Sequence, residues 1–141
     1  MVICSYHVVI SFSICVVTYL LILEGNDSMN ELTNLFKVLS DETRLRIIML
    51  LAEKDLCVCE ICGITNLSQP NVSKHLSKLR DMGIVKDERK GQFISYYLNS
   101  DDLLLKKIIQ SIMDNIGKYP ILKGDLEQIV DADKYLSLCK K

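Results

Sequence analysis

Apolar residues recur every three or four positions in five stretches of the chain, a spacing that gathers them on one face of a helix. These stretches lie at about 30–39, 41–53, 57–64, 69–82 and 101–116. Two strand-like stretches, Ile84–Arg89 and Phe93–Leu98, flank a turn at Lys90-Gly91-Gln92. The pattern therefore predicts a mainly helical fold with one small β-hairpin.

Residues at the helix boundaries support these limits. Ser40 is a suitable N-cap for the second helix, and Ser68 for the fourth. Pro70 fits the first turn of the fourth helix and Gly83 its C-terminal cap. The stripes expected to be buried are Leu45, Ile48 and Ala52 in the second helix, with Ile47 and Leu51 beside them, and Val72, Leu76 and Leu79 in the fourth.

The third and fourth helices are short and joined by the tight connection Thr65-Asn66-Leu67-Ser68. The fourth is polar and basic on its outer face, which is typical of a helix-turn-helix whose second helix enters the DNA major groove. The hairpin, with its basic tip, then corresponds to a wing. The sequence thus predicts a winged helix-turn-helix that binds double-stranded operator DNA.

The fourth helix and the hairpin tip carry the expected DNA contacts. Candidates for base edges are Gln69, Asn71, Ser73, Lys74 and His75. Phosphate contacts, which add affinity without sequence information, are expected from Lys74, Lys78, Arg89 and Lys90. The alternative for each is a solvated surface role, and for His75, close to the buried stripe, a packing role.

The helix predicted at 101–116 has an unusually wide apolar face. Its apolar residues are Leu103, Leu104, Leu105, Ile108, Ile109, Ile112, Met113 and Ile116. So broad a face favours burial against a second copy of the protein, together with the first helix, and we expect a homodimer. The tail from Gly117 to Lys141 is typical of a loop and a short helix, and the sequence assigns it no role.

Length and charge narrow the picture further. A chain of 141 residues accommodates one domain with a real core, which we place at 29–116. The net charge of −1 does not favour nucleic acid. However, every Lys and Arg lies at or beyond Lys37, and Ser68–Lys90 holds more basic than acidic residues. This local basic strip indicates a phosphate-binding surface.

Residues 1–28 stand apart from the predicted domain. Met1–Leu23 contains no Asp, Glu, Lys or Arg and is long enough to span a bilayer, but it lacks the basic start of a secretory signal. Met29 begins a sequence typical of a natural first helix, and codons for Glu24-Gly25 can spell a ribosome-binding site. We expect 1–28 to be a leader translated from a start assigned too early; the alternative is a membrane anchor.

Three of the six cysteines, Cys57, Cys59 and Cys62, crowd into the predicted third helix. Clustered thiols are more often metal-binding or redox-active than part of a disulfide framework, so a reducing, cytoplasmic setting is expected. Cys59 and Cys62 form a Cys-x-x-Cys pair, but the strand–helix–strand context of a thiol oxidoreductase is missing, and we do not expect an enzyme. For any cysteine, Cys139 included, the plain alternative is a small apolar packing residue.

Several of these segments resemble the ArsR/SmtB family of bacterial and archaeal repressors over about Glu31 to Ile116. The resemblance is carried by Leu39–Ile47, Leu67–Leu76, Gly83-Ile84-Val85 and Tyr96-Tyr97-Leu98. It implies a homodimer that sits on operator DNA and releases it when a metal or metalloid binds.

The segment Asp55–Cys62 is similar to the Leu-Cys-Val-Cys-Asp-Leu-Cys element of the arsenite- and antimonite-responsive branch. By that resemblance Cys57, Cys59 and Cys62 are the ligands of As(III) or Sb(III), and no further cofactor is implied. The zinc-responsive branch uses Asp and His residues on the last helix, and this chain has no His after His75. Soft thiolates suit such ions, and arsenic(III) takes three sulfurs where structural zinc normally takes four ligands. Cadmium, lead and thiol oxidation stay open as alternative signals.

The spacing of the cysteines suggests how binding becomes a signal. On a regular helix, at about 100° per residue, Cys57 and Cys59 point about 160° apart, and Cys59 and Cys62 about 60°. One ion can hold all three sulfurs only if the start of this helix unwinds. The hypothesis is that binding distorts the helix-turn-helix, so that ligand and DNA weaken each other's binding equally.

Overall fold

The computed structural model describes residues 28–99 and 101–140. The predicted leader, apart from Ser28, lies outside the described residues. The chain divides into two compact units, Met1–Lys37 and Val38–Lys141, and a first helix, residues 28–39, runs across this division. In the described ranges no helix is both long and apolar enough to cross a membrane.

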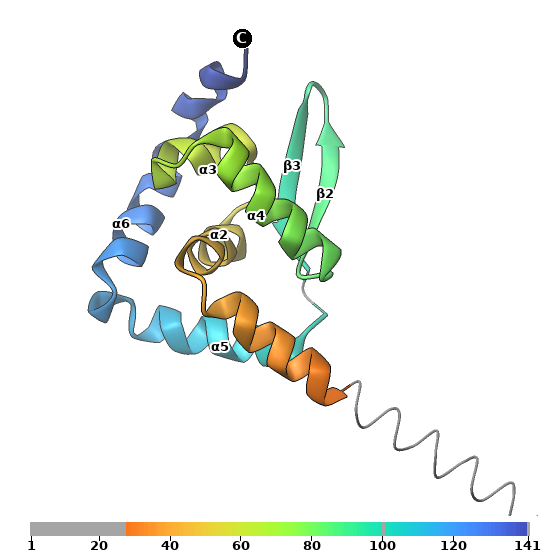
Figure 1. The fold of residues 1–141 in the computed structure, drawn as a ribbon. Coiled ribbons are helices and arrows are strands. Elements are labelled where there is room, and N and C mark those ends of the chain that lie inside the picture. Colours follow the sequence, from red (N-terminus) through yellow and green to blue (C-terminus); the bar gives the residue numbers. More distant parts are fainter. Residues whose placement is uncertain (1–27, 100, 141) are drawn as a thin grey trace, which may run out of the picture. The chain divides into compact units, whose positions relative to one another are not determined.

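The second unit combines helices with a small antiparallel sheet (Figure 1). Its first four helices are α2 (Glu42–Glu53), α3 (Val58–Thr65), α4 (Gln69–Asp81) and α5 (Leu103–Asp114). The strands β1 (Leu56–Cys57), β2 (Val85–Lys90) and β3 (Phe93–Leu98) pair in the order β1-β3-β2. The mainly helical fold with a hairpin wing is confirmed.

Strand β1 is the element that the apolar pattern did not predict. Leu56 pairs with Tyr96 of β3, and Cys57 with Ser95. The spacing placed Cys57 at the start of the third helix, but it is extended, with φ −86° and ψ 167°. Two residues are too few to show a strand period, and the partner strand lies far along the chain.

Helix α2 forms the centre of the core. Its residues Ile47–Leu51 are buried without interruption, because α2 packs against α3, α4, α6 and β3. The prediction was right for Ile47, Ile48 and Leu51, but Met49 and Leu50 are buried as well, and Leu45 and Ala52 are only half-buried. The buried part of α2 is therefore its middle, enclosed by its neighbours, and not a stripe along its length. The N-cap is also one residue later than predicted: Asp41, not Ser40, accepts a hydrogen bond from the Arg44 amide at 2.9 Å.

The chain beyond α5 is folded onto the domain. After the short 3-10 helix η1 (Ile116–Lys118) come α6 (Pro120–Gln128) and the 3-10 segment η2 (Ile129–Lys140), which is interrupted at Asp131. Helix α6 packs against α2, and η2 packs against α3 (Figure 1). This tail, for which the sequence predicted a loop and one short helix, covers the outer side of the helix that carries the cysteines.

Candidate nucleic-acid interface and sensing helix

A tight left-handed turn separates α3 from α4. Asn66 has φ 56° and ψ 34°, and Ser68 then adopts the extended N-cap conformation, although its side chain makes no capping hydrogen bond. Helix α4 begins at Gln69, directly after the predicted N-cap Ser68, and Pro70 lies in its first turn as predicted. Gly83 follows the helix, and its φ of 70° fits the predicted C-terminal cap. The geometry is that of a helix-turn-helix.

The outer face of α4 is polar and accessible. Val72, Leu76 and Leu79 are buried, as predicted, while Gln69 and Ser73 are exposed. Lys74 and Lys78 are also exposed, and Asn71 is half-buried. Side chains on such a face can reach base edges and phosphates without moving the backbone.

His75 has a specific neighbour in the fold. Its side chain is only 16% exposed, and Nδ1 lies 3.7 Å from Oδ1 of Asp41, the residue that caps α2. This contact favours the packing role that its position beside the apolar stripe indicated.

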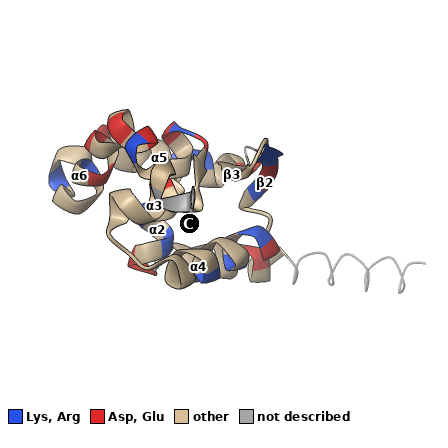
Figure 2. Cartoon of the chain, turned by 90° about the horizontal axis from the view of Figure 1, so that it is seen from above, with Lys and Arg blue, Asp and Glu red and all other residues tan. Residues whose placement is uncertain are grey.

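The hairpin carries basic groups at its tip, and Figure 2 marks the Lys and Arg residues of the hairpin and of α4 in blue, in separate parts of the view. Arg89 and Lys90 are exposed, and Arg89 donates from Nε to the carbonyl of Gly91 at 3.2 Å. Lys90 pairs with Asp55 at 3.0 Å, and this hydrogen bond raises the pKa of Lys90. Any phosphate contact by Lys90 would therefore compete with Asp55.

The three cysteines occupy different environments around the start of α3. Cys57 and Cys59 are buried and Cys62 is half-buried. The amide of Cys57 donates to Oε2 of the buried Glu60 at 2.7 Å, which ties the end of β1 to the first turn of α3. Burial raises the pKa of both the Cys57 and Cys62 thiols, and the charge of a Cys57 thiolate raises that of Cys62 further.

The three sulfurs are not assembled as a ligand set. Cys59 is disulfide-bonded, whereas Cys57 and Cys62 are free thiols. Within residues 28–99 and 101–140, no three His, Cys, Asp or Glu side chains converge as a metal site requires. Cys57 is extended, so the prediction that the three cysteines lie on one regular helix was wrong. A three-thiol site would need Cys59 to be reduced and the start of α3 to rearrange.

A cavity of about 300 Å³ opens beside Cys57. It is lined by Cys57, Val58, Gln69, Gln92, Phe93, Ile94 and Tyr96. These residues come from the start of α3, the start of α4 and the hairpin. The cavity thus places a cysteine of the proposed ligand set next to the first residue of the helix expected to contact DNA.

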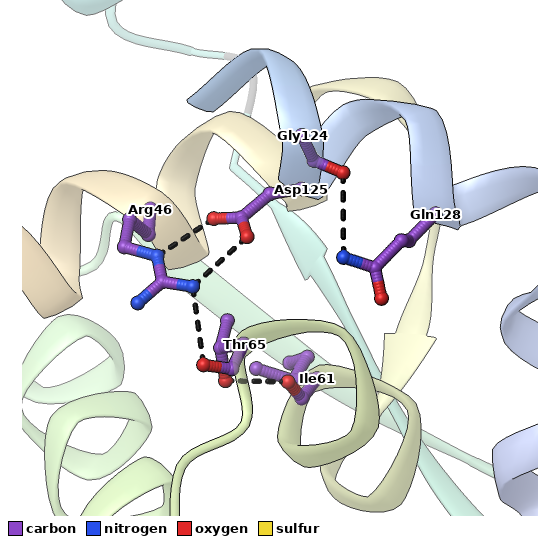
Figure 3. A network of polar contacts seen from close by, with 6 residues as sticks. All are labelled: Arg46, Ile61, Thr65, Gly124, Asp125 and Gln128. Carbon is purple, nitrogen blue, oxygen red and sulfur yellow. Dashed lines mark hydrogen bonds and ion pairs between the residues drawn. The ribbon is translucent and has the colours of Figure 1, made fainter. Parts of the chain in front are cut away.

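An ion pair that sequence reasoning missed joins three helices (Figure 3). Arg46 of α2 donates from Nε and Nη2 to the two carboxylate oxygens of Asp125 in α6, at 2.7 and 2.9 Å. Nη2 also donates to the carbonyl of Thr65 at 3.1 Å. The position of Arg46 between Leu45 and Ile47 in an apolar helix could have indicated that it is partly buried and needs a partner. Nothing near Asp125 in the sequence indicates its partner, 79 residues away.

The sequence profile described as "Bacterial regulatory protein, arsR family" matches residues 41–87. Arsenic resistance transcriptional regulator ArsR1 of Pseudomonas putida is 44% identical over 82 residues, which are 54% of this chain and 64% of that protein. Transcriptional repressor SdpR of Bacillus subtilis is 42% identical over 87 residues, covering 62% of this chain and 94% of that protein. The cadmium resistance regulatory protein CadC of Listeria innocua is 35% identical over 81 residues, 57% of this chain and 68% of that protein.

Solved structures agree with these relatives. Reduced HlyU from Vibrio cholerae superposes with a TM-score of 0.57 at 29% identity, over 63% of this chain and 92% of that one. The antimony-specific repressor AntR gives 0.55 at 30% identity, over 64% and 80%. The chain spans less than two thirds of the first arsenic regulators it matches, 64% of ArsR1 among them. Because the match to SdpR covers nearly all of that protein, the chain belongs to the arsR family of bacterial regulatory proteins.

Proposed function

We propose that the chain is a DNA-binding transcriptional repressor that releases its operator when As(III) or Sb(III) binds Cys57, Cys59 and Cys62. The observation that carries the proposal is the position of the cysteines on and just before α3, directly ahead of the turn that orients α4. The relatives support it, because arsenic resistance regulators and an antimony-specific repressor are among them.

DNA recognition is assigned to the exposed side of α4 and to the hairpin tip. Gln69 and Asn71 can each form a bidentate pair with adenine, and Ser73 accepts several bases. Lys74, Lys78, Arg89 and Lys90 supply charge to the phosphates, with Lys90 first leaving Asp55. His75, held near Asp41, supports the helix from behind.

The repressor is proposed to be a homodimer. Helix α5 leaves Leu103 and Leu104 71% and 42% exposed, and the first helix exposes Leu32 and Phe36. Large exposed apolar patches mark protein–protein interaction sites, and we assign the exposed apolar side chains of each helix to such a site. Two copies would present two α4 helices to a pseudo-palindromic operator, with half-sites about one helical turn or a multiple of it apart.

The raised thiol pKa values bear on which ion is sensed. Arsenite at neutral pH is the uncharged molecule As(OH)₃, and three thiols displace its three hydroxyl groups as water, with no net release of protons. Cd²⁺ or Pb²⁺ must instead expel the thiol protons, and burial of Cys57 and Cys62 opposes this. The buried thiols therefore favour arsenic(III) at neutral pH.

A second candidate signal is thiol oxidation. The disulfide at Cys59 favours it, because an oxidised Cys59 cannot act as a thiolate ligand. In that case oxidation, rather than an ion, would alter the start of α3. The repressor function is common to both candidates.

Fluorescence anisotropy of the full chain on DNA from its own promoter tests the proposal. Under reducing conditions we expect arsenite to release the wild-type protein but not the Cys57→Ser or Cys62→Ser variants. Release by oxidant but not by arsenite would replace metalloid sensing with the second candidate. A failure to bind promoter DNA at all would contradict the repressor function.

A further inference from the structure

We propose that the C-terminal segment, residues 120–137, is a brace that holds α3 and the turn after it in the DNA-binding position. Asp125 and Tyr135 are its positioning residues. Inducer binding at α3 then works against the brace. This last step rests on the proposed function, whereas the mechanical role of the brace stands on contacts within the fold.

The first attachment acts on the end of α3. Thr65 is the last residue of that helix, and its carbonyl, like others at a helix C-terminus, lacks an intrahelical partner. Arg46 supplies a charged donor to it, and its orientation is set by the two-pronged pair with Asp125. The Arg46 and Asp125 side chains are only 14% and 6% exposed. Asp125 of α6 thereby fixes the residue directly before Asn66, where the helix-turn-helix bends.

The second attachment lies beside the cysteines. The Tyr135 ring packs so closely on Gly63 that a methyl group added there would overlap it. The Tyr135 hydroxyl donates to Oε1 of Gln128 at 3.2 Å, which ties the ring to α6. Ala132 of η2 is fully buried, and Asp133 pairs with Lys54 at 3.2 Å. The brace therefore contacts the residue that follows Cys62.

These attachments set the direction of the effect. An ion that draws Cys57, Cys59 and Cys62 together rearranges the start of α3, and the brace holds the other end of the same short helix at Gly63 and Thr65. Contacts made in only one of two conformations shift the balance toward it. A weakened brace is expected to loosen α3, lower operator affinity without inducer and reduce the arsenite needed for release.

The test compares full-length Asp125→Asn with Glu127→Gln. Each removes one carboxylate charge from α6, but Glu127 is exposed and pairs only with Lys123 at 3.9 Å. Tyr135→Leu is a second variant that leaves every charge in place. Operator Kd is measured by anisotropy, and local opening by amide hydrogen exchange of α3 with α5 as internal reference. We expect Asp125→Asn and Tyr135→Leu to raise Kd about fivefold, a coupling of the usual size. Exchange should accelerate more in α3 than in α5, because loss of the buried pair also lowers overall stability, and Glu127→Gln should match wild type.

The brace and the sensing function can fail separately. If the wild type ignores arsenite while Asp125→Asn still loosens α3 and weakens operator binding, metalloid sensing is refuted and the brace stands. If both brace variants match Glu127→Gln in α3 exchange, the brace is overturned whatever arsenite does. Faster exchange spread equally over α3 and α5 overturns it as well, because the contacts would then serve overall stability alone.

Discussion

The two helices of the helix-turn-helix differ in how they are held. Helix α4 packs through one apolar stripe and leaves its other face to solvent, so its buried and exposed faces can be predicted from its own sequence. Helix α3 is enclosed by β1, α2 and η2, and its ends are tied by Glu60 and Arg46. A surface for reading DNA needs accessible side chains, whereas a helix that responds to a ligand needs contacts that can be broken. The comparison predicts that changes around α3 affect both stability and operator binding, whereas changes on α4 affect DNA affinity alone.

The largest effect is expected from breaking the buried ion pair. Arg46→Met leaves Asp125 buried without its partner, which should lower the free energy of unfolding by about 3–5 kcal/mol. Urea denaturation measures the loss. Lys123→Met, which breaks the exposed pair with Glu127, is the control and should cost under about 1 kcal/mol. Equal losses in the two variants would contradict the special position of Arg46.

The next effect compares the cost of adding a methyl group at two glycines, Gly63 in α3 and Gly83 directly after α4. Gly63 has no room for a methyl group because of Tyr135, whereas Gly83 has room but a φ of 70°. Gly83→Ala should cost about 1–2 kcal/mol from backbone conformation alone. Gly63→Ala should cost about 1–3 kcal/mol from overpacking, although alanine is the better helix former. In a Tyr135→Ala background the Gly63→Ala change should become stabilising; a cost that persists there would show that Tyr135 is not the cause.

On α4 the expected effect is on DNA affinity alone. Lys74→Gln or Lys78→Gln removes an exposed charge and should leave the free energy of unfolding unchanged within about 0.5 kcal/mol. Because each substitution removes one phosphate-binding lysine from both copies of the proposed homodimer, the slope of log K against log salt should fall by about 1.8, twice the roughly 0.9 for a single contact. Anisotropy titrations at several salt concentrations measure the slope. Lys118→Gln, on η1 and away from α4, serves as the control, and an equal change in its slope would remove the assignment to α4.

The smallest effect is a pH dependence of stability that belongs to the α3 cysteines. Burial raises the pKa of Cys57 and Cys62 above the ordinary value of 9.0, so the fold favours the protonated thiols. Their contribution is complete below that value and is lost as pH rises through the folded pKa. Under reducing conditions, wild type should therefore lose more stability between pH 8 and pH 10 than Cys57→Ser. Parallel profiles for the two proteins would contradict this account.

The local sequence pattern was sufficient to predict α4 and the hairpin, but it was insufficient to predict the contacts around α3. The Val72, Leu76 and Leu79 stripe and the Gly83 cap are encoded by neighbouring residues. By contrast, Cys57 is extended because it pairs with Ser95, and Arg46 is buried because it meets Asp125. Partners so distant along the chain leave no periodic signal. The assignment of the ion ligands remains a prediction, since the three sulfurs are not gathered in this conformation.

Because β1 pairs with β3, Cys57 is connected to the rest of the fold in two ways. Along the backbone it leads into α3 and, through the turn at Asn66, to α4. Across the ladder it is joined to Ser95, and β3 leads from there back to the hairpin tip. A displacement of Cys57 would therefore affect both α4 and the hairpin, the two elements that are proposed to contact DNA. If an ion or an oxidant acts on Cys57, as proposed above, a change at one residue reaches both elements that are proposed to contact DNA.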